Sequence, residues 1–285
     1  MHRSPVTVAL AAYCALTTLA VSSARADDTT PPQPFSLPTR HDGYWARDPA
    51  RPFLATTIDV GYLYLRPRLT LGYGKPFTKW VGIDLNPLVT NEGYGAYGGL
   101  RVQIPWFDFR AGARGFSAFT HEYLTPAAHY SSVDLQETTG QASKYVTLEA
   151  DVSGGIPAGP GTILLVLTAS AVELVPAGKY VYEETLRVIT NPPAIYRART
   201  GYALRLGPEG AARVGVVGEL LDLPGRGDLV FRAGVIASFA IDDHLEALGL
   251  LVIPVASPDS IGIAGGDFAE LGIRYRWATG AHDAR

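Results

Sequence analysis

The chain has 285 residues, of which 24 are lysine or arginine and 27 are aspartate or glutamate, a formal net charge of −3. This balance excludes the strongly basic surface that nucleic-acid binding requires. Because the single cysteine, Cys14, lies close to the N-terminus, the composition also excludes a disulfide framework and a thiolate metal site.

The first 26 residues have the pattern of a secretory signal peptide. A short basic start (His2 and Arg3) precedes the mostly apolar residues 6–20, and residues 24–26 (Ala-Arg-Ala) form a small-residue cleavage pattern. The apolar stretch is too short for a membrane-spanning helix, although a membrane anchor is the alternative interpretation. Export by the general route leaves 22 basic and 27 acidic residues in the remaining chain.

The rest of the chain changes character near residue 55. Residues 27–54 are rich in proline and without periodicity, which predicts an extended periplasmic lead-in. Over residues 55–277, segments such as 145–153 (YVTLEADVS) alternate apolar and polar side chains between Gly, Pro and Asp turns. Residues 278–285 form a short C-terminal tail.

The alternating segments predict about twelve strands, within a range of ten to fourteen. We expect them near residues 55–66, 68–86, 93–104, 106–119, 144–155, 161–174, 179–190, 196–207, 211–222, 228–241, 244–255 and 267–277. Tight turns such as Asp242-Asp243 indicate antiparallel hairpins. With both ends in the periplasm, this count places Asp242-Asp243 on the periplasmic side, and the long 120–143 segment as well. The count changes if 68–86 is two strands or if 132–137 is a further strand.

Three features predict that the apolar faces point outward into a membrane. The segments have the length of membrane-crossing strands, and their polar faces mix arginine and acids with glycine, serine and threonine. Aromatic residues suited to a bilayer interface lie near segment ends: Tyr62, Tyr64, Tyr73, Trp80, Trp106, Tyr145, Tyr180, Tyr182, Tyr196, Tyr275 and Trp277. The predicted fold is therefore all-β, a single closed antiparallel transmembrane β-barrel. A soluble secreted β protein is the alternative.

The last alternating segment resembles a known family. Residues 268–277 (FAELGIRYRW) are similar to the closing strand of bacterial outer-membrane β-barrel proteins, in which alternating apolar residues end in an aromatic one. Here eight residues follow Trp277, whereas the aromatic residue is usually terminal in that family. The resemblance implies a Gram-negative outer-membrane location, contact with outer-membrane lipid, and recognition by the barrel-assembly machinery. It leaves the oligomeric state open.

The charged residues of the polar faces are the candidate lumen-lining residues. They are Asp59, Asp84, Arg101, Asp108, Arg110, Arg114, Glu149, Asp151, Glu183, Arg187, Arg197, Arg199, Arg205, Arg213, Glu219, Arg232, Glu246, Glu270, Arg274 and Arg276. Both signs are represented almost equally, which predicts a porin-like, narrow passive channel for small polar solutes with weak charge selectivity. The alternative is a closed structural or binding barrel whose lumen is filled by salt bridges. We expect no cofactor and no metal, because the histidines are scattered.

One short stretch carries a weak enzymatic pattern. Residues 129–132 (His-Tyr-Ser-Ser) are similar to the His-x-Ser-Asn element of outer-membrane phospholipase A and the lipid A deacylases. The resemblance implies that His129 is the general base and Ser131 the nucleophile of a lipid hydrolase. Ser132 stands where that family has asparagine. A solvated loop histidine is the alternative, and we expect a protein that is not an enzyme.

Overall fold

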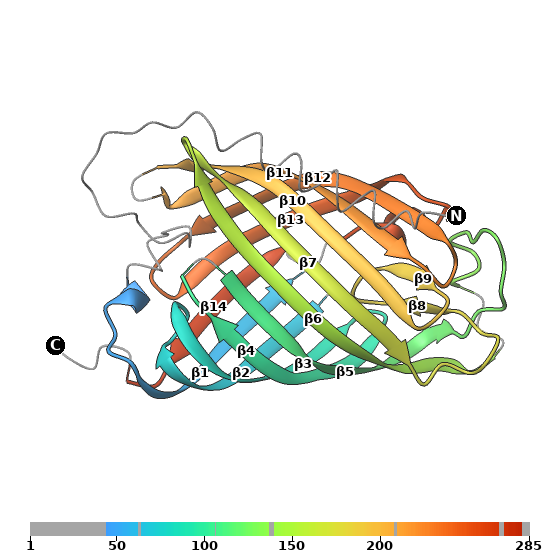
Figure 1. The fold of residues 1–285 in the computed structure, drawn as a ribbon, viewed down its shortest axis with the longest axis horizontal. Coiled ribbons are helices and arrows are strands. Elements are labelled where there is room, and N and C mark those ends of the chain that lie inside the picture. The colour runs from blue at the N-terminus through green and yellow to red at the C-terminus, as the bar shows by residue number, and fades with distance from the viewer. Residues whose placement is uncertain are drawn as a thin grey trace, which may run out of the picture. The chain divides into compact units, whose positions relative to one another are not determined.

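A computed structural model describes residues 44–61, 64–105, 107–136, 140–207, 210–267 and 271–280. Every described strand lies within residues 34–285. Twelve strands form one closed antiparallel barrel with neighbours in the order β1-β14-β13-β12-β11-β10-β7-β6-β5-β4-β3-β2 (Figure 1). The predicted fold class and the count of twelve are therefore confirmed. The predicted signal peptide and most of the predicted lead-in lie outside the described residues.

The barrel strands have the length that a membrane crossing requires. They are β1 (Arg51–Gly61), β2 (Tyr64–Lys75), β3 (Lys79–Thr90), β4 (Gly93–Gln103), β5 (Phe107–Glu122), β6 (Ala142–Ala158), β7 (Gly161–Glu173), β10 (Ala194–Leu206), β11 (Ala212–Leu223), β12 (Asp228–Ala240), β13 (Leu245–Ala256) and β14 (Gly272–Ala278). All except β14 have 11 to 17 residues, longer than is usual in soluble proteins. β14 closes the ring by pairing with β1 over its whole length. No helix among the described residues is long and apolar enough to cross a membrane.

The barrel has apolar side chains outside and charged side chains inside. Val235 and Leu148 are 51% and 50% exposed, whereas Arg232 and Glu149 on the same strands are 1% and 6% exposed. Successive side chains of a strand point to opposite faces, so this contrast repeats along the wall. The predicted outward orientation of the apolar faces is confirmed. A closed ring with such a surface suits hydrocarbon, because no strand edge is left without hydrogen-bond partners.

The count of twelve arises from two errors that cancel. The segment predicted as one strand over 68–86 is two strands, β2 and β3, separated by a turn in which Phe77 has a φ of 60°. The segment predicted as a wall strand over 179–190 is instead a separate hairpin, formed by β8 (Val181–Glu183) and β9 (Val188–Thr190). Alternation alone cannot distinguish a wall strand from a short hairpin with the same pattern.

These two corrections also settle the topology. Every long connection, after β5, β7 and β13, lies at one end of the barrel, which we call the loop end. The opposite end holds the start of β1 and the end of β14, and its connections are short turns; we call it the terminus end. The 120–143 segment is therefore opposite Asp242-Asp243, and not on the same side as predicted. Short turns on one side and long loops on the other are typical of outer-membrane barrels.

The predicted aromatic residues divide into two groups. Tyr73 and Tyr196 are 59% and 46% exposed on the outer face, as an interface position requires. Trp80, Tyr145 and Tyr182 are buried instead, so their assignment to the bilayer interface is wrong. Each occupies a position where the interior needs a large apolar side chain. Tyr62 and Trp106 lie outside the described residues.

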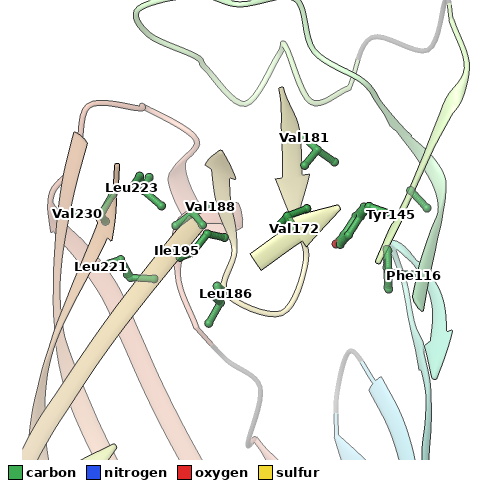
Figure 2. Close-up of a cluster of buried hydrophobic side chains, with 11 residues drawn as sticks. Phe116, Tyr145, Val172, Val181, Leu186, Val188, Ile195, Leu221, Leu223 and Val230 are labelled. Carbon is green, nitrogen blue, oxygen red and sulfur yellow. The ribbon is translucent and has the colours of Figure 1, made fainter. Parts of the chain in front are cut away.

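The β8–β9 hairpin packs inside the ring of strands near the loop end (Figure 1). Its Val181, Leu186 and Val188 belong to one buried cluster with inward-facing side chains of six wall strands. Those side chains are Phe116, Ala118, Tyr145, Val172, Ile195, Leu221, Leu223 and Val230. Figure 2 shows Leu186 between Leu221 on one side and Tyr145 on the other. The hairpin therefore packs against the inner faces of six consecutive strands, from β5 to β12.

A second apolar cluster lies at the terminus end. Trp45, in a short helical turn before β1, is 1% exposed and packs with Phe53, Ala55, Trp80 and Ala278. We call this group the Trp45 cluster. β1 begins at Arg51, inside the predicted lead-in of residues 27–54, which brings Phe53 into the wall and gives Trp45 a partner.

The outward orientation of the wall makes a quantitative prediction. Val235→Arg, near the middle of β12, places a charge in hydrocarbon and is expected to cost about 2–4 kcal/mol of unfolding free energy. Denaturant titration of the protein folded into lipid vesicles measures this cost. Val235→Leu, which stays apolar, is the control and should remain within about 0.5 kcal/mol of the original chain. Equal unfolding free energies for the two variants would contradict an outward-facing Val235.

Candidate functional site

The interior of the barrel is a network of ion pairs that join neighbouring strands. Among the described residues, five ion pairs lie directly opposite each other in the strand register: Asp59 with Arg274 and with Arg66, Arg110 with Asp151, and Glu219 with Arg232 and with Arg199. Side chains at such positions are within reach of each other. The register of the sheet therefore places these opposite charges next to each other.

Asp59 on β1 links the strands at which the barrel closes. Its carboxylate accepts hydrogen bonds from Arg274 Nε at 2.6 Å and from Arg66 Nη2 at 2.9 Å. Arg274 belongs to β14 and Arg66 to β2, so one buried acid binds both neighbours of β1. Such bonds to a charged acceptor are stronger than neutral ones, and they reinforce the closure.

Arg101 on β4 makes a similar three-strand connection. Its Nε donates to Asp108 of β5 at 2.9 Å, and its Nη1 donates to Asp84 of β3 at 3.1 Å. The register places Arg101 opposite Arg110, and the surrounding acids compensate these two like charges. Arg110 in turn lies 2.7 Å from Asp151 and 3.1 Å from Glu149, both on β6.

Two arginines of the wall hold the hairpin. Arg232 on β12 lies 2.9 Å from the Glu219 carboxylate and also donates to the carbonyl oxygens of Leu186 and Arg187, at 2.9 and 2.8 Å. On the other wall, Arg114 forms an ion pair with Glu149 and contacts Thr185 of the hairpin tip. The tip of the hairpin is thus bonded to the wall by backbone as well as side-chain groups.

The remaining predicted lumen residues lie in three places. On the inward faces of wall strands are Arg197, Arg199, Arg205, Arg213, Glu246 and Arg276. Of these, Arg199 pairs with Glu219, and Arg276 lies 2.9 Å from Glu246. Glu183 and Arg187 belong to the hairpin and not to the wall. Glu270 lies outside the described residues.

The prediction from sequence missed several interior charges. Arg66 and Arg68 share the inward face of β2 with Thr70, but the predicted boundary between the 55–66 and 68–86 segments divided β2 and concealed this alternation. Asp267 comes from the connection after β13 and forms an ion pair with Arg199 inside the barrel. The predicted strand over 267–277 begins at Asp267, whereas β14 begins at Gly272. Asp267 is therefore a loop residue, and alternation could not indicate its inward position.

Arg226, in the turn between β11 and β12, holds the loops of the loop end together. It forms a two-point ion pair with Asp259 at 2.7 and 2.9 Å and donates to the carbonyl of Ile189 on β9. Its guanidinium also lies over the rings of Tyr130 and Tyr180, 5.2 and 5.8 Å from their centroids. Arg226 therefore connects its own turn with the hairpin and with the long loops.

A buried acid at the hairpin tip is poorly compensated. Neither carboxylate oxygen of Glu184 has a hydrogen-bond partner among the described residues, and the side chain is 3% exposed. Its charged neighbours are His121, 3.8 Å away on β5, together with Arg187 and the like-charged Glu92. Burial raises the pKa of Glu184 above its ordinary value, and the His121 contact opposes this effect only in part.

The two residues of the predicted hydrolase pair have other partners. His129 Nδ1 lies 2.9 Å from the carbonyl oxygen of Pro258, and the Ser131 hydroxyl donates to Asp134 at 2.8 Å. Both residues lie in the long loop between β5 and β6. Within the described residues, no hydrogen bond joins His129 to Ser131, and no group of three or more His, Cys, Asp or Glu side chains could hold a metal ion.

Comparison with known proteins finds similar folds and no relative. No family model and no curated protein matches the chain. The loop-deleted OmpT outer membrane protein of Vibrio cholerae is 9% identical with a TM-score of 0.33, over 79% of this chain and 97% of that one. The NanC porin is 8% identical with a TM-score of 0.35, over 80% and 97%. The translocator domain of the autotransporter NalP from Neisseria meningitidis is 13% identical with a TM-score of 0.33, over 96% of both chains. At such values no activity or ligand transfers to this chain.

The central position of Glu219 leads to a prediction about stability. Glu219→Gln removes the charge between Arg199 and Arg232 and leaves buried cations without full compensation, which is expected to cost about 3–5 kcal/mol. Denaturant titration in lipid vesicles measures the loss. Glu173→Gln, which removes an exposed acid at the end of β7, should change stability by less than about 0.5 kcal/mol. A similar small change for both variants would contradict the role assigned to Glu219.

Glu184 leads to a prediction about pH. Because its pKa is raised in the folded state, the charged carboxylate destabilises the fold above that pKa, and this penalty disappears as the pH falls below the ordinary value. Glu184→Gln should therefore stabilise the protein by about 1 kcal/mol at neutral pH. The gain over the original chain should vanish near pH 4. Unfolding titrations at several pH values test this, and a gain that does not depend on pH would contradict it.

Proposed function

We propose that this outer-membrane β-barrel is a closed binding or structural barrel with a salt-bridged lumen, and not an open channel. The observation that carries the proposal is the packing of the hairpin residues Val181, Leu186 and Val188 against six wall strands. A side chain is buried in this way only where its neighbours leave no water-filled gap. The loop-end half of the lumen is consequently occupied by the chain itself.

The hydrogen bonds of the hairpin support the same proposal. Arg232 binds two carbonyl oxygens of the hairpin, and the hairpin tip also contacts Arg114 from the opposite side. Arg226 attaches the hairpin to the outer loops. Opening a passage along the barrel axis would require these bonds and the apolar cluster to break together. The narrow passive channel predicted from the polar faces remains the competing hypothesis.

We also propose how the barrel enters and contacts the membrane. Outer-membrane lipid would contact the outward apolar side chains, of which Val216 is 62% and Ile253 is 53% exposed. The barrel-assembly machinery would recognise the alternating strand β14, which ends close to the tail. The pairing of β14 with β1 over Ala55–Gly61 would then complete the ring.

Conductance separates the closed barrel from the channel. The purified, folded chain should give no conductance steps in a planar lipid bilayer. In a second variant, a short Gly/Ser linker replaces residues 176–191 and Trp45 is changed to alanine (Trp45→Ala). This variant lacks both the hairpin and the central side chain of the Trp45 cluster at the terminus end. This variant should give steps, because the wall that remains encloses a polar passage.

Trp45→Ala alone is the matched control, since it removes the Trp45 side chain and keeps the hairpin. It should give no conductance steps. Conductance steps of equal size from the original chain and from the hairpin-free variant would overturn the closed barrel in favour of a passive channel.

A further inference from the structure

Between the Trp45 cluster and the ion pairs lies a cavity of about 120 Å³. Its wall comes from β1, β2, β3, β4 and β14 and from the turn that holds Phe77. Its described lining includes four arginines, Arg68, Arg101, Arg274 and Arg276, and no aspartate or glutamate. The cavity thus has a cationic wall and, at the terminus end, an aromatic one.

The acids near this cavity are committed to other contacts. Asp59 binds Arg66 and Arg274, while Glu246 binds Arg276. Asp84 and Asp108 both bind Arg101, and Thr70 also donates to Asp84. Among the described residues, these groups together with Arg68 are five arginines and four acids, which leaves one positive charge in excess.

The excess charge belongs to Arg68 on β2. No ion pair joins Arg68 to a carboxylate within the part of the chain that the structure describes, and its buried Nε has no hydrogen-bond partner. An uncompensated cation that is partly shielded from water is costly unless an anion accompanies it. The planar guanidinium offers two parallel donors, which match the two oxygens of a carboxylate.

We infer that this cavity is a binding site for a small organic carboxylate. The carboxylate pairs with Arg68, and the apolar part of the ligand packs against Phe53, Phe77 and Trp80. A cavity of roughly 150 Å³ accommodates benzene, so a ligand of about six non-hydrogen atoms is the appropriate size. The site does not depend on whether the barrel conducts, because it is built from wall residues that are present in both cases.

Butyrate is a suitable probe, with its amide, butyramide, as the neutral analogue of the same shape. Isothermal titration of the folded full chain in detergent, in a buffer free of carboxylates, should detect butyrate binding. Butyramide should bind at least tenfold more weakly, because it has no charge to compensate Arg68. Arg68→Gln should lose at least tenfold in butyrate affinity, and Arg68→Lys should fall between the two.

Arg205→Gln is the matched control for the loss of one arginine. Arg205 lies on the inward face of β10, outside the cavity lining, and its variant should bind butyrate as the original chain does. Unchanged butyrate affinity in Arg68→Gln, equal binding of butyramide, or no butyrate binding by the original chain would overturn the site. Inorganic phosphate that binds as tightly as butyrate would overturn the role given to the aromatic wall.

Stability without ligand gives a second readout that does not need binding. Arg68→Gln should unfold at the same or a higher temperature than the original chain when no anion is present, because it removes the excess charge. Addition of butyrate should raise the unfolding temperature of the original chain and leave that of Arg68→Gln unchanged. A fall in unfolding temperature in Arg68→Gln without ligand would mean that Arg68 has a structural partner, and would overturn the premise.

Discussion

The need to compensate buried charge governs the interior of this barrel. The period of two in each strand sends half of the side chains inward, and the outer half must be apolar because it faces hydrocarbon. The charged residues are therefore confined to the lumen, where an uncompensated charge is costly. Asp59, Arg101 and Glu219 each satisfy this requirement by joining three adjacent strands. The same ion pairs that compensate the buried charges therefore also hold neighbouring strands in register.

The hairpin follows from a second requirement, which applies to the loop end. There the inward faces carry large apolar side chains such as Phe116, Leu221 and Val230, which an open lumen would expose to water. The β8–β9 hairpin covers them with its own apolar residues, so the hydrophobic effect fixes it in place. Arg232 connects the two layers, because it compensates Glu219 and binds the hairpin backbone at the same time. Without the hairpin, the inward apolar side chains of the wall lose these contacts, and without those side chains the hairpin loses them.

The two ends of the lumen therefore differ in character. The loop end is filled by packed side chains, and the loops above it converge on Arg226. The terminus end is capped by a smaller aromatic cluster that leaves a cavity with four arginines below it. A solute from the terminus side would meet the cavity first. The proposed carboxylate site therefore lies at the terminus end, and the proposed closure of the lumen lies at the loop end.

Local sequence determined which face of each strand meets the membrane, because alternation needs only neighbouring residues. It thereby identified the charged interior, including Asp59, Glu219 and Arg232, and the closed antiparallel barrel. Only the tertiary structure decided that residues 179–190 are a hairpin inside the lumen, since a wall strand and an inserted hairpin share the same period. It alone brought Asp267 to Arg199 and left Arg68 without an acidic partner among the described residues, because these depend on contacts between residues far apart in sequence.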